Sequence, residues 1–224
     1  MSDLTILVTG FLAFPGAPVN PSAAIVMRLL QRHARRFRLH GISLQTAVLP
    51  VVYDEVTREL ETLVARTHPD AIVHLGLASW RKQLSVETRA VNRITTLHPD
   101  AAKRRAAARA VRAGGLPALR SPLATLSLAM LMARTGVPAQ LSIDAGDYVC
   151  NQTLYASLAS GDAPAVFIHV PRLTGVRREP DDDDDDAPAP ITLLALTRAV
   201  EAALIAIAAH VRRMRRDALT ASCR

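Results

Sequence analysis

Short apolar runs alternate with amphipathic segments along most of the chain. Leu4–Thr9 is an apolar run that stops at Gly10, which is typical of a buried strand. Apolar residues from Val52 to Val64 follow the three-and-four spacing of a helix, which the segment Arg66–Asp70 should end. Further strands are expected at Ile42–Val48, Ala71–Leu75, Ala139–Ile143 and Val166–Val170. Further helices are expected from Asn20 or Ser22 toward Arg36, from Ser121 to near Gly136, over Val149–Leu158, and from Thr192 past His210.

This alternation of strands and helices predicts an α/β fold. We expect a single domain over residues 1–224, built as three layers (α/β/α) around a mostly parallel central sheet. Half of the residues are apolar but only 4% are aromatic, so Ala, Leu and Val should build the core. Residues 95–120 are basic and rich in Ala, and we expect them to form loops.

Two segments are expected to lie outside the packed core. Six consecutive aspartates, Asp181–Asp186, stand between Pro180 and Pro188 and repel one another, so residues 176–190 are predicted to form a mobile acidic loop. A calcium site there would need alternating ligands and a turn glycine, which the run lacks. Residues 217–224 are predicted to be a disordered tail.

Charge and hydropathy restrict the partners and the location. The net charge of +7 comes from the basic segments Arg32–Arg38, Lys103–Arg112 and Arg212–Arg216. A nucleic-acid surface is one explanation, but stacking aromatics and a nucleic-acid module signature are missing, so we expect a solvated basic surface. The start lacks the pattern of a secretory signal, and the apolar stretch Ala199–Val211 is short and interrupted. We expect a cytoplasmic protein without nucleic-acid or membrane partners.

One cysteine and one histidine stand where chemistry is expected. Cys150, one of only two cysteines, follows a turn with glycine and begins a predicted helix. Backbone N–H groups at a helix start favour a thiolate and can bind a developing oxyanion. His169 closes a predicted strand, where functional groups of open α/β sheets gather. If the fold brings the two together, they form the thiolate–imidazole pair of a cysteine hydrolase. A small buried thiol and a core histidine are the alternatives.

Three further residues are functional candidates only if they lie close to that pair. Glu87 could orient an imidazole and stabilise its charged form, although a lone glutamate more often lies at the surface. Phe11 and Phe14 fall in one loop after a strand and could present their rings to a flat ligand. Core anchoring would explain both rings equally well.

Taken in order, these segments resemble the pyroglutamyl peptidase I (pyrrolidone-carboxylate peptidase) family of cysteine peptidases. The resemblance covers nearly the whole chain. The matching segments are Ile6–Phe11 with Phe14 and Asn20–Ser22, then Gly76, Arg81, Leu84–Glu87 and Asn92, then Ser142, Ala145–Gly146 and Tyr148–Asn151, and finally Phe167–Pro171. The cysteine and histidine motifs are specific, and the glutamate motif is degraded.

The resemblance implies a role for each matched residue. It implies Cys150 as nucleophile, His169 as general base and acid, and Glu87 as the group that orients His169. Phe11 and Phe14 would line the pocket for the pyroglutamyl ring. Further implied binding or supporting residues are Asn20, Arg81 and Asp100.

The resemblance also implies an activity. The substrates would be peptides with an N-terminal pyroglutamate, a lactam without charge that suits an apolar pocket. Neither a metal nor an organic cofactor is expected, and the resemblance suggests a homo-oligomer, either a dimer or a tetramer.

The chain departs from the family pattern mainly around the glutamate. Thr88 follows Glu87 where a basic residue is usual, and Ser79–Trp80 stand where small residues are usual. Ile143 replaces a polar residue, and Ile94–Thr96 replace an acidic pair. Two other functions therefore stay open: a cysteine amidase for another N-acyl or lactam substrate, and a weakly active homologue whose basic surface binds an acidic partner.

Overall fold

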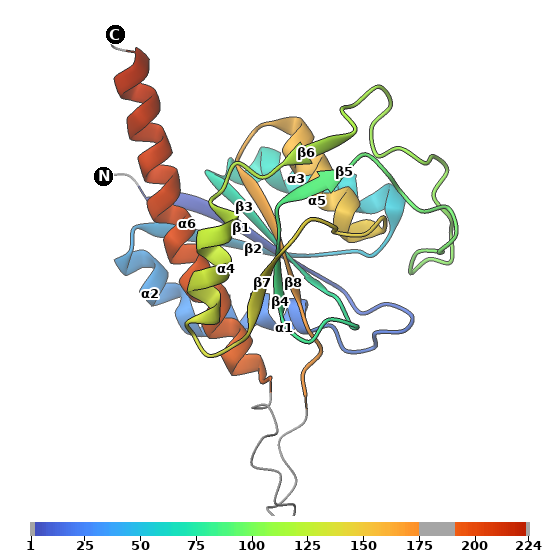
Figure 1. Cartoon of the computed structure of the whole chain (residues 1–224), viewed down its shortest axis with the longest axis horizontal. Coiled ribbons are helices and arrows are strands. Elements are labelled where there is room, and N and C mark those ends of the chain that lie inside the picture. The colour runs from blue at the N-terminus through green and yellow to red at the C-terminus, as the bar shows by residue number, and fades with distance from the viewer. Residues whose placement is uncertain (1–2, 175–190, 223–224) are drawn as a thin grey trace, which may run out of the picture.

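A computed structural model describes residues 3–174 and 191–222 of the chain. A six-stranded sheet in the order β2-β1-β3-β8-β4-β7 runs through its centre, with helices on both faces (Figure 1). The strands are β1 (Leu4–Phe11), β2 (Ile42–Leu49), β3 (Ala71–Leu77), β4 (Leu84–Glu87), β7 (Ala139–Ser142) and β8 (Ala165–Val170). Neighbouring strands are parallel except β4 and β8, which are antiparallel. The expected three-layer fold with a mostly parallel sheet is confirmed.

The helices form the two outer layers. One layer holds α1 (Pro21–Arg28), a π-helical turn η1 (Leu29–His33), α2 (Ala34–Leu39), α4 (Thr125–Ala133) and α6 (Leu193–Ser222). The opposite layer holds α3 (Tyr53–Thr67) and α5 (Val149–Ser160). A short antiparallel ribbon of β5 (Arg89–Val91) and β6 (Ala118–Arg120) lies against α5. Each layer buries its own apolar cluster against the sheet, mostly of aliphatic side chains and Ala, as expected.

One expected helix boundary and one expected strand boundary are wrong. The helix expected at Ser121 begins at Thr125. The Ser121 hydroxyl instead donates to the Ala165 carbonyl of β8 and so holds the preceding loop on the sheet. Gly76, expected to end its strand, lies inside β3, which continues to Leu77.

The C-terminal region is more ordered than its sequence suggests. Helix α6 continues to Ser222, so the predicted disorder is wrong for residues 217–222. No Gly or Pro interrupts residues 217–222, and Ala218, Leu219 and Ala221 are good helix formers. The predicted acidic loop at 176–190 and residues 223–224 lie outside the described residues.

Helix α6 is also long and apolar enough over Leu193–Ala221 to cross a membrane. However, 56% of its most apolar window is buried inside the protein. Its buried residues, such as Leu196, Val200 and Leu204, pack with the sheet in the main apolar cluster. The helix therefore has the character of a core helix.

A fully buried histidine joins the sheet to α5. The two ring nitrogens of His74 on β3 lie 2.7 Å from Thr9 Oγ1 and 2.8 Å from Ser157 Oγ. Burial lowers the pKa of His74 to about 3, so the ring is neutral at physiological pH. In the unfolded chain the ring titrates near its ordinary pKa of about 6.5.

We therefore predict that His74 makes the protein sensitive to acid. Between pH 6.5 and 3 the unfolded state binds this proton and the folded state does not, so stability falls as the pH is lowered. The loss from His74 should be about 2 kcal/mol between pH 7 and pH 5. Urea unfolding at both pH values measures it, with His74→Gln as the matched variant. An equal pH dependence in the two proteins would contradict the prediction.

Candidate active site

Cys150 is the second residue of α5 and follows the turn formed by residues 144–148. The Gly146 backbone has a φ of +81°, which favours glycine, and its N–H donates to Asp144 Oδ1. Asn151 holds the start of α5 in place, because its side chain donates to the Val91 and Arg93 carbonyls and accepts from the Val91 N–H. The position of Cys150 is thus set by the turn that precedes it and by the hydrogen bonds of the residue that follows it.

Gly76 leaves the space in which the cysteine side chain lies. It pairs with His169 across the β3–β8 ladder. A Cβ atom at position 76 would lie 2.5 Å from Phe167 Cζ, which is too close for a real side chain, and 3.0 Å from Cys150 Sγ, which is tighter than most real contacts. Cys150 Sγ therefore packs on β3, on the strand next to the one that carries His169.

Glu87 meets His169 because β4 runs against β8. The antiparallel register pairs Ser85 with His169 and Glu87 with Phe167, so Glu87 is a diagonal neighbour of His169 on one sheet face. His169 Nδ1 lies 2.8 Å from Glu87 Oε1. The carboxylate can therefore fix the ring's orientation, as the sequence predicts.

Arg81 is the cationic partner of this carboxylate. Its Nη1 donates to Glu87 Oε1 over 2.7 Å, and its Nη2 donates to the Asp144 carbonyl over 2.8 Å and to Ser142 Oγ over 3.2 Å. Arg81 thereby ties the carboxylate to the turn that precedes Cys150. Its predicted contact with substrate stays a prediction, since these bonds occupy both terminal nitrogens.

The electrostatics of the buried pair favour an ionised Glu87. Burial alone would raise the pKa of its carboxyl, but the hydrogen bond and charge of His169 and the charge of Arg81 hold that pKa below its ordinary value. Burial lowers the pKa of His169 in spite of the opposing effect of Glu87. The ring is therefore neutral and can accept a proton.

The thiol rests in its neutral form. Burial, followed by the negative charge of Glu87, raises the pKa of Cys150 to about 12. Arg81 and the residue's own backbone N–H act in the opposite direction but are outweighed. The backbone N–H at the helix start lowers the pKa of the thiol, as expected, but does not by itself offset the burial. A neutral thiol beside a neutral imidazole requires that the base remove the proton during attack.

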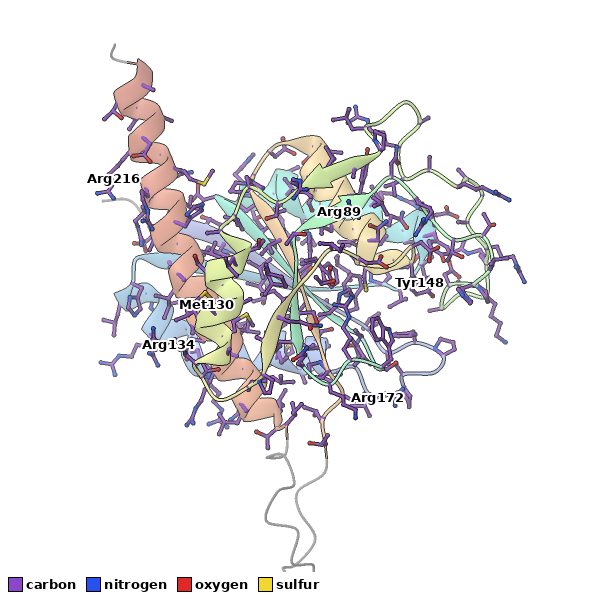
Figure 2. All side chains as sticks on the ribbon, in the orientation of Figure 1. Arg89, Met130, Arg134, Tyr148, Arg172 and Arg216 are labelled. Atoms are coloured by element: carbon purple, nitrogen blue, oxygen red, sulfur yellow. The ribbon has the colours of Figure 1, made fainter. Side chains whose placement is uncertain are left out.

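Two hollows meet at Cys150. The smaller one, of about 50 Å³, is lined almost entirely by apolar side chains: Phe11, Phe14, Asn20, Val51, Leu77, Tyr148, Val149 and Cys150. The larger one, of about 210 Å³, is lined by Leu77, Ala78, Trp80, Arg81, residues 144–148, Cys150 and His169. Figure 2 shows Tyr148, which lines both hollows, on the side of the molecule away from α6. Hollows of about 530 and 660 Å³ elsewhere contain neither Cys150 nor His169.

The remaining predicted residues surround the smaller hollow or support it. Phe11 packs on Phe167 with ring centroids 6.1 Å apart, and Phe14 lies 6.5 Å from Tyr148. Asn20 caps α1 by accepting from the Ser22 N–H and donates to the Leu12 carbonyl.

Asp100 has a supporting position. Its carboxylate accepts from the Tyr53 and Arg104 backbone N–H groups and so joins the start of α3 to the loop beside the site. Sequence reasoning missed Val51, Leu77 and Tyr148 as lining residues. Only Tyr148, close to Cys150 in sequence, carried a signal that could have revealed it.

Comparisons with known proteins agree with this geometry. The pyroglutamyl peptidase family model matches residues 4–213. The chain is 34% identical over 174 residues to pyrrolidone-carboxylate peptidase 1 of Ralstonia nicotianae, covering 75% of this chain and 79% of the relative. It is 30% identical over 210 residues to the Streptococcus pyogenes peptidase, covering 91% and 92%.

The fold is likewise similar to solved structures of such enzymes. The crystal structure of pyroglutamyl peptidase I from Bacillus amyloliquefaciens matches with a TM-score of 0.79 and 26% identity, over 93% of this chain and 98% of that one. The pyrrolidone carboxyl peptidase of Thermus thermophilus matches with a TM-score of 0.73 and 33% identity, over 89% and 98%. Sequence and structure together show that the chain belongs to the pyroglutamyl peptidase family of cysteine peptidases.

Proposed function

We propose that this protein hydrolyses the bond that follows an N-terminal pyroglutamyl residue, with Cys150, His169 and Glu87 as its catalytic residues. The observation that carries the proposal is the bond of 2.8 Å between Glu87 and His169, because the same histidine lines a hollow together with Cys150. Family membership supports the same reaction.

The geometry suggests the following sequence of steps. His169 accepts the thiol proton as Cys150 Sγ attacks the carbonyl carbon, and Glu87 stabilises the imidazolium that forms. Backbone N–H groups at the start of α5 are the proposed donors to the oxyanion. The imidazolium then protonates the leaving amine, and an acyl-enzyme remains. His169 next activates a water molecule that releases pyroglutamate and restores the thiol.

The smaller hollow fits the acyl part of such a substrate. Pyroglutamate is a lactam without a charged amine, so its binding site should be apolar with few polar groups. The rings of Phe11, Phe14 and Tyr148 line this hollow next to the thiol, and Asn20 is its only amide side chain.

The proposal predicts release of amine from pyroglutamyl-amide substrates by the wild-type protein. Cys150→Ala and Cys150→Ser should abolish this release, because either change removes the thiol that forms the acyl-enzyme. A fluorogenic pyroglutamyl amide provides the assay, and prolyl and acyl-aminoacyl amides complete the panel. Full activity in Cys150→Ala would exclude the thiol as nucleophile. A preference for another amide in the panel would favour the alternative cysteine amidase.

The resting state of the thiol gives a second prediction. In a Cys223→Ser background, the rate of alkylation of Cys150 by iodoacetamide should still rise above pH 10, because the pKa of the thiol is raised to about 12. Glu87→Gln removes a negative charge that raises this pKa, so it should increase the rate at pH 8. A plateau of the wild-type rate near pH 8.5 would contradict the prediction. A catalytic thiol with this raised pKa is alkylated slowly at pH 7. Slow alkylation therefore does not distinguish the peptidase from the weakly active binding protein.

We further propose that the protein forms a homo-oligomer through α4. Leu126 and Met130 lie one helical turn apart on α4 and are more than half exposed. Figure 2 shows Met130 on α4, beside the long helix α6. Exposed apolar patches on helices commonly mark interfaces, so a second copy of the chain is the proposed partner.

Light scattering coupled to size-exclusion chromatography should give a mass of two or four times 24.1 kDa. Met130→Glu should lower that mass, because it buries a charge in the interface, whereas Leu39→Glu, at an exposed position of α2, should not. A monomeric wild-type protein would refute this part of the proposal.

We also propose a cytoplasmic location, where the catalytic thiol stays reduced.

A further inference from the structure

The two hollows at Cys150 place the two halves of a substrate. The imidazole must reach the leaving amine to protonate it. His169 lines the larger hollow and is not part of the smaller one. The acyl group therefore belongs in the smaller hollow, and the chain that leaves belongs in the larger one.

The rim of the larger hollow is acidic, although the protein as a whole is basic. Asp144 and Asp147 line it. Among the residues that the structure describes, no cationic side chain forms an ion pair with Asp144, whose carboxylate accepts only the Gly146 N–H. The carboxylate of Asp147 lies 3.7 Å from Arg93 Nε, and both side chains are well exposed. Arg81, the cation inside the hollow, is neutralised by the ion pair with Glu87.

An aromatic ring and a buried donor complete this hollow. Trp80 is 77% exposed, and the guanidinium carbon of Arg81 lies 4.8 Å from its ring centroid. An indole ring in water attracts cationic side chains to its face. Arg81 is 8% exposed, and its Nε is buried without a hydrogen-bond partner in the described part of the chain. Arg81 therefore forms part of the wall of the hollow, whereas the exposed ring of Trp80 is accessible to the chain that leaves.

We propose that Trp80, Asp144 and Asp147 form a binding site for the residue that follows pyroglutamate, and that this site prefers a cationic side chain, Lys or Arg. The inference rests on the proposed peptidase function and adds a substrate class to it. The carboxylates attract the cationic head, and the indole ring contacts its stem and charge. An acidic residue at the same place is repelled.

The test compares three peptides that differ only in the second residue: pyroglutamyl-Lys-Ala, pyroglutamyl-Gln-Ala and pyroglutamyl-Glu-Ala. Release of pyroglutamate gives kcat/KM for each. We expect the Lys peptide to exceed the Glu peptide by about 3- to 10-fold, the size of one exposed ion pair with one exposed cation–π contact. The ratio should shrink toward one as the salt concentration rises, because the charges are exposed to solvent.

Matched variants assign the preference to this site. Asp144→Asn keeps the shape and the acceptor of the Gly146 N–H but removes the charge, so the Lys-to-Glu ratio should fall at least by half. Trp80→Leu should lower kcat/KM for the Lys peptide more than for the Gln peptide. Asp162→Asn removes an acidic side chain outside both hollows at Cys150 and should leave the ratio unchanged.

A fluorogenic pyroglutamyl amide, whose leaving group has no amino-acid side chain, separates the two levels of the proposal. If the wild-type protein does not cleave it, the peptidase function itself fails. If the protein cleaves it but hydrolyses the three peptides equally, the cationic preference is wrong and the peptidase function stands. An unchanged ratio in Asp144→Asn would likewise overturn the site.

Discussion

The rest of the site depends on the contacts of the buried Glu87 carboxylate with His169 and Arg81. A carboxylate without water is stable only when cations and hydrogen bonds replace its hydration. Here one oxygen, Oε1, serves both partners at 2.7 and 2.8 Å. The arginine keeps the carboxylate ionised, and the ionised carboxylate in turn holds the imidazole in one orientation. Arg81 therefore positions the imidazole through another residue, and it also binds the turn that leads to Cys150.

The antiparallel pairing of β4 with β8 sets the geometry of this contact. Its register places Ser85 opposite His169 and Glu87 opposite Phe167, so Glu87 lies diagonally from His169 on the same face of the sheet. The glycine on β3 then leaves room for the thiol beside the imidazole. Catalytic residues from two antiparallel strands and the start of a helix thus converge at one place in the fold.

Much of this arrangement was accessible from the sequence, and the limits have physical causes. Apolar runs predicted β1, β3 and β8 because these strands are buried on both faces. The motifs around Cys150 and His169 predicted the pair, because a helix start and a strand end are local features. Strand β4 was not predicted, and its orientation was not accessible either, since strand direction depends on long-range pairing. Nor did the sequence reveal the resting protonation of Cys150, which depends on burial and on a charge brought from a distant segment.

The neutral resting thiol has a consequence for the lifetime of the enzyme. Peroxides and other oxidants attack thiolates, and the oxidation that follows can become irreversible at the sulfinic stage. A cysteine that is deprotonated only while substrate is bound offers oxidants little of the reactive form between turnovers. The proton that His169 must remove in each cycle slows the attack on substrate, but it also shields the nucleophile. The buried charge of Glu87 therefore acts on both residues, because it orients the base and helps to keep the resting thiol protonated.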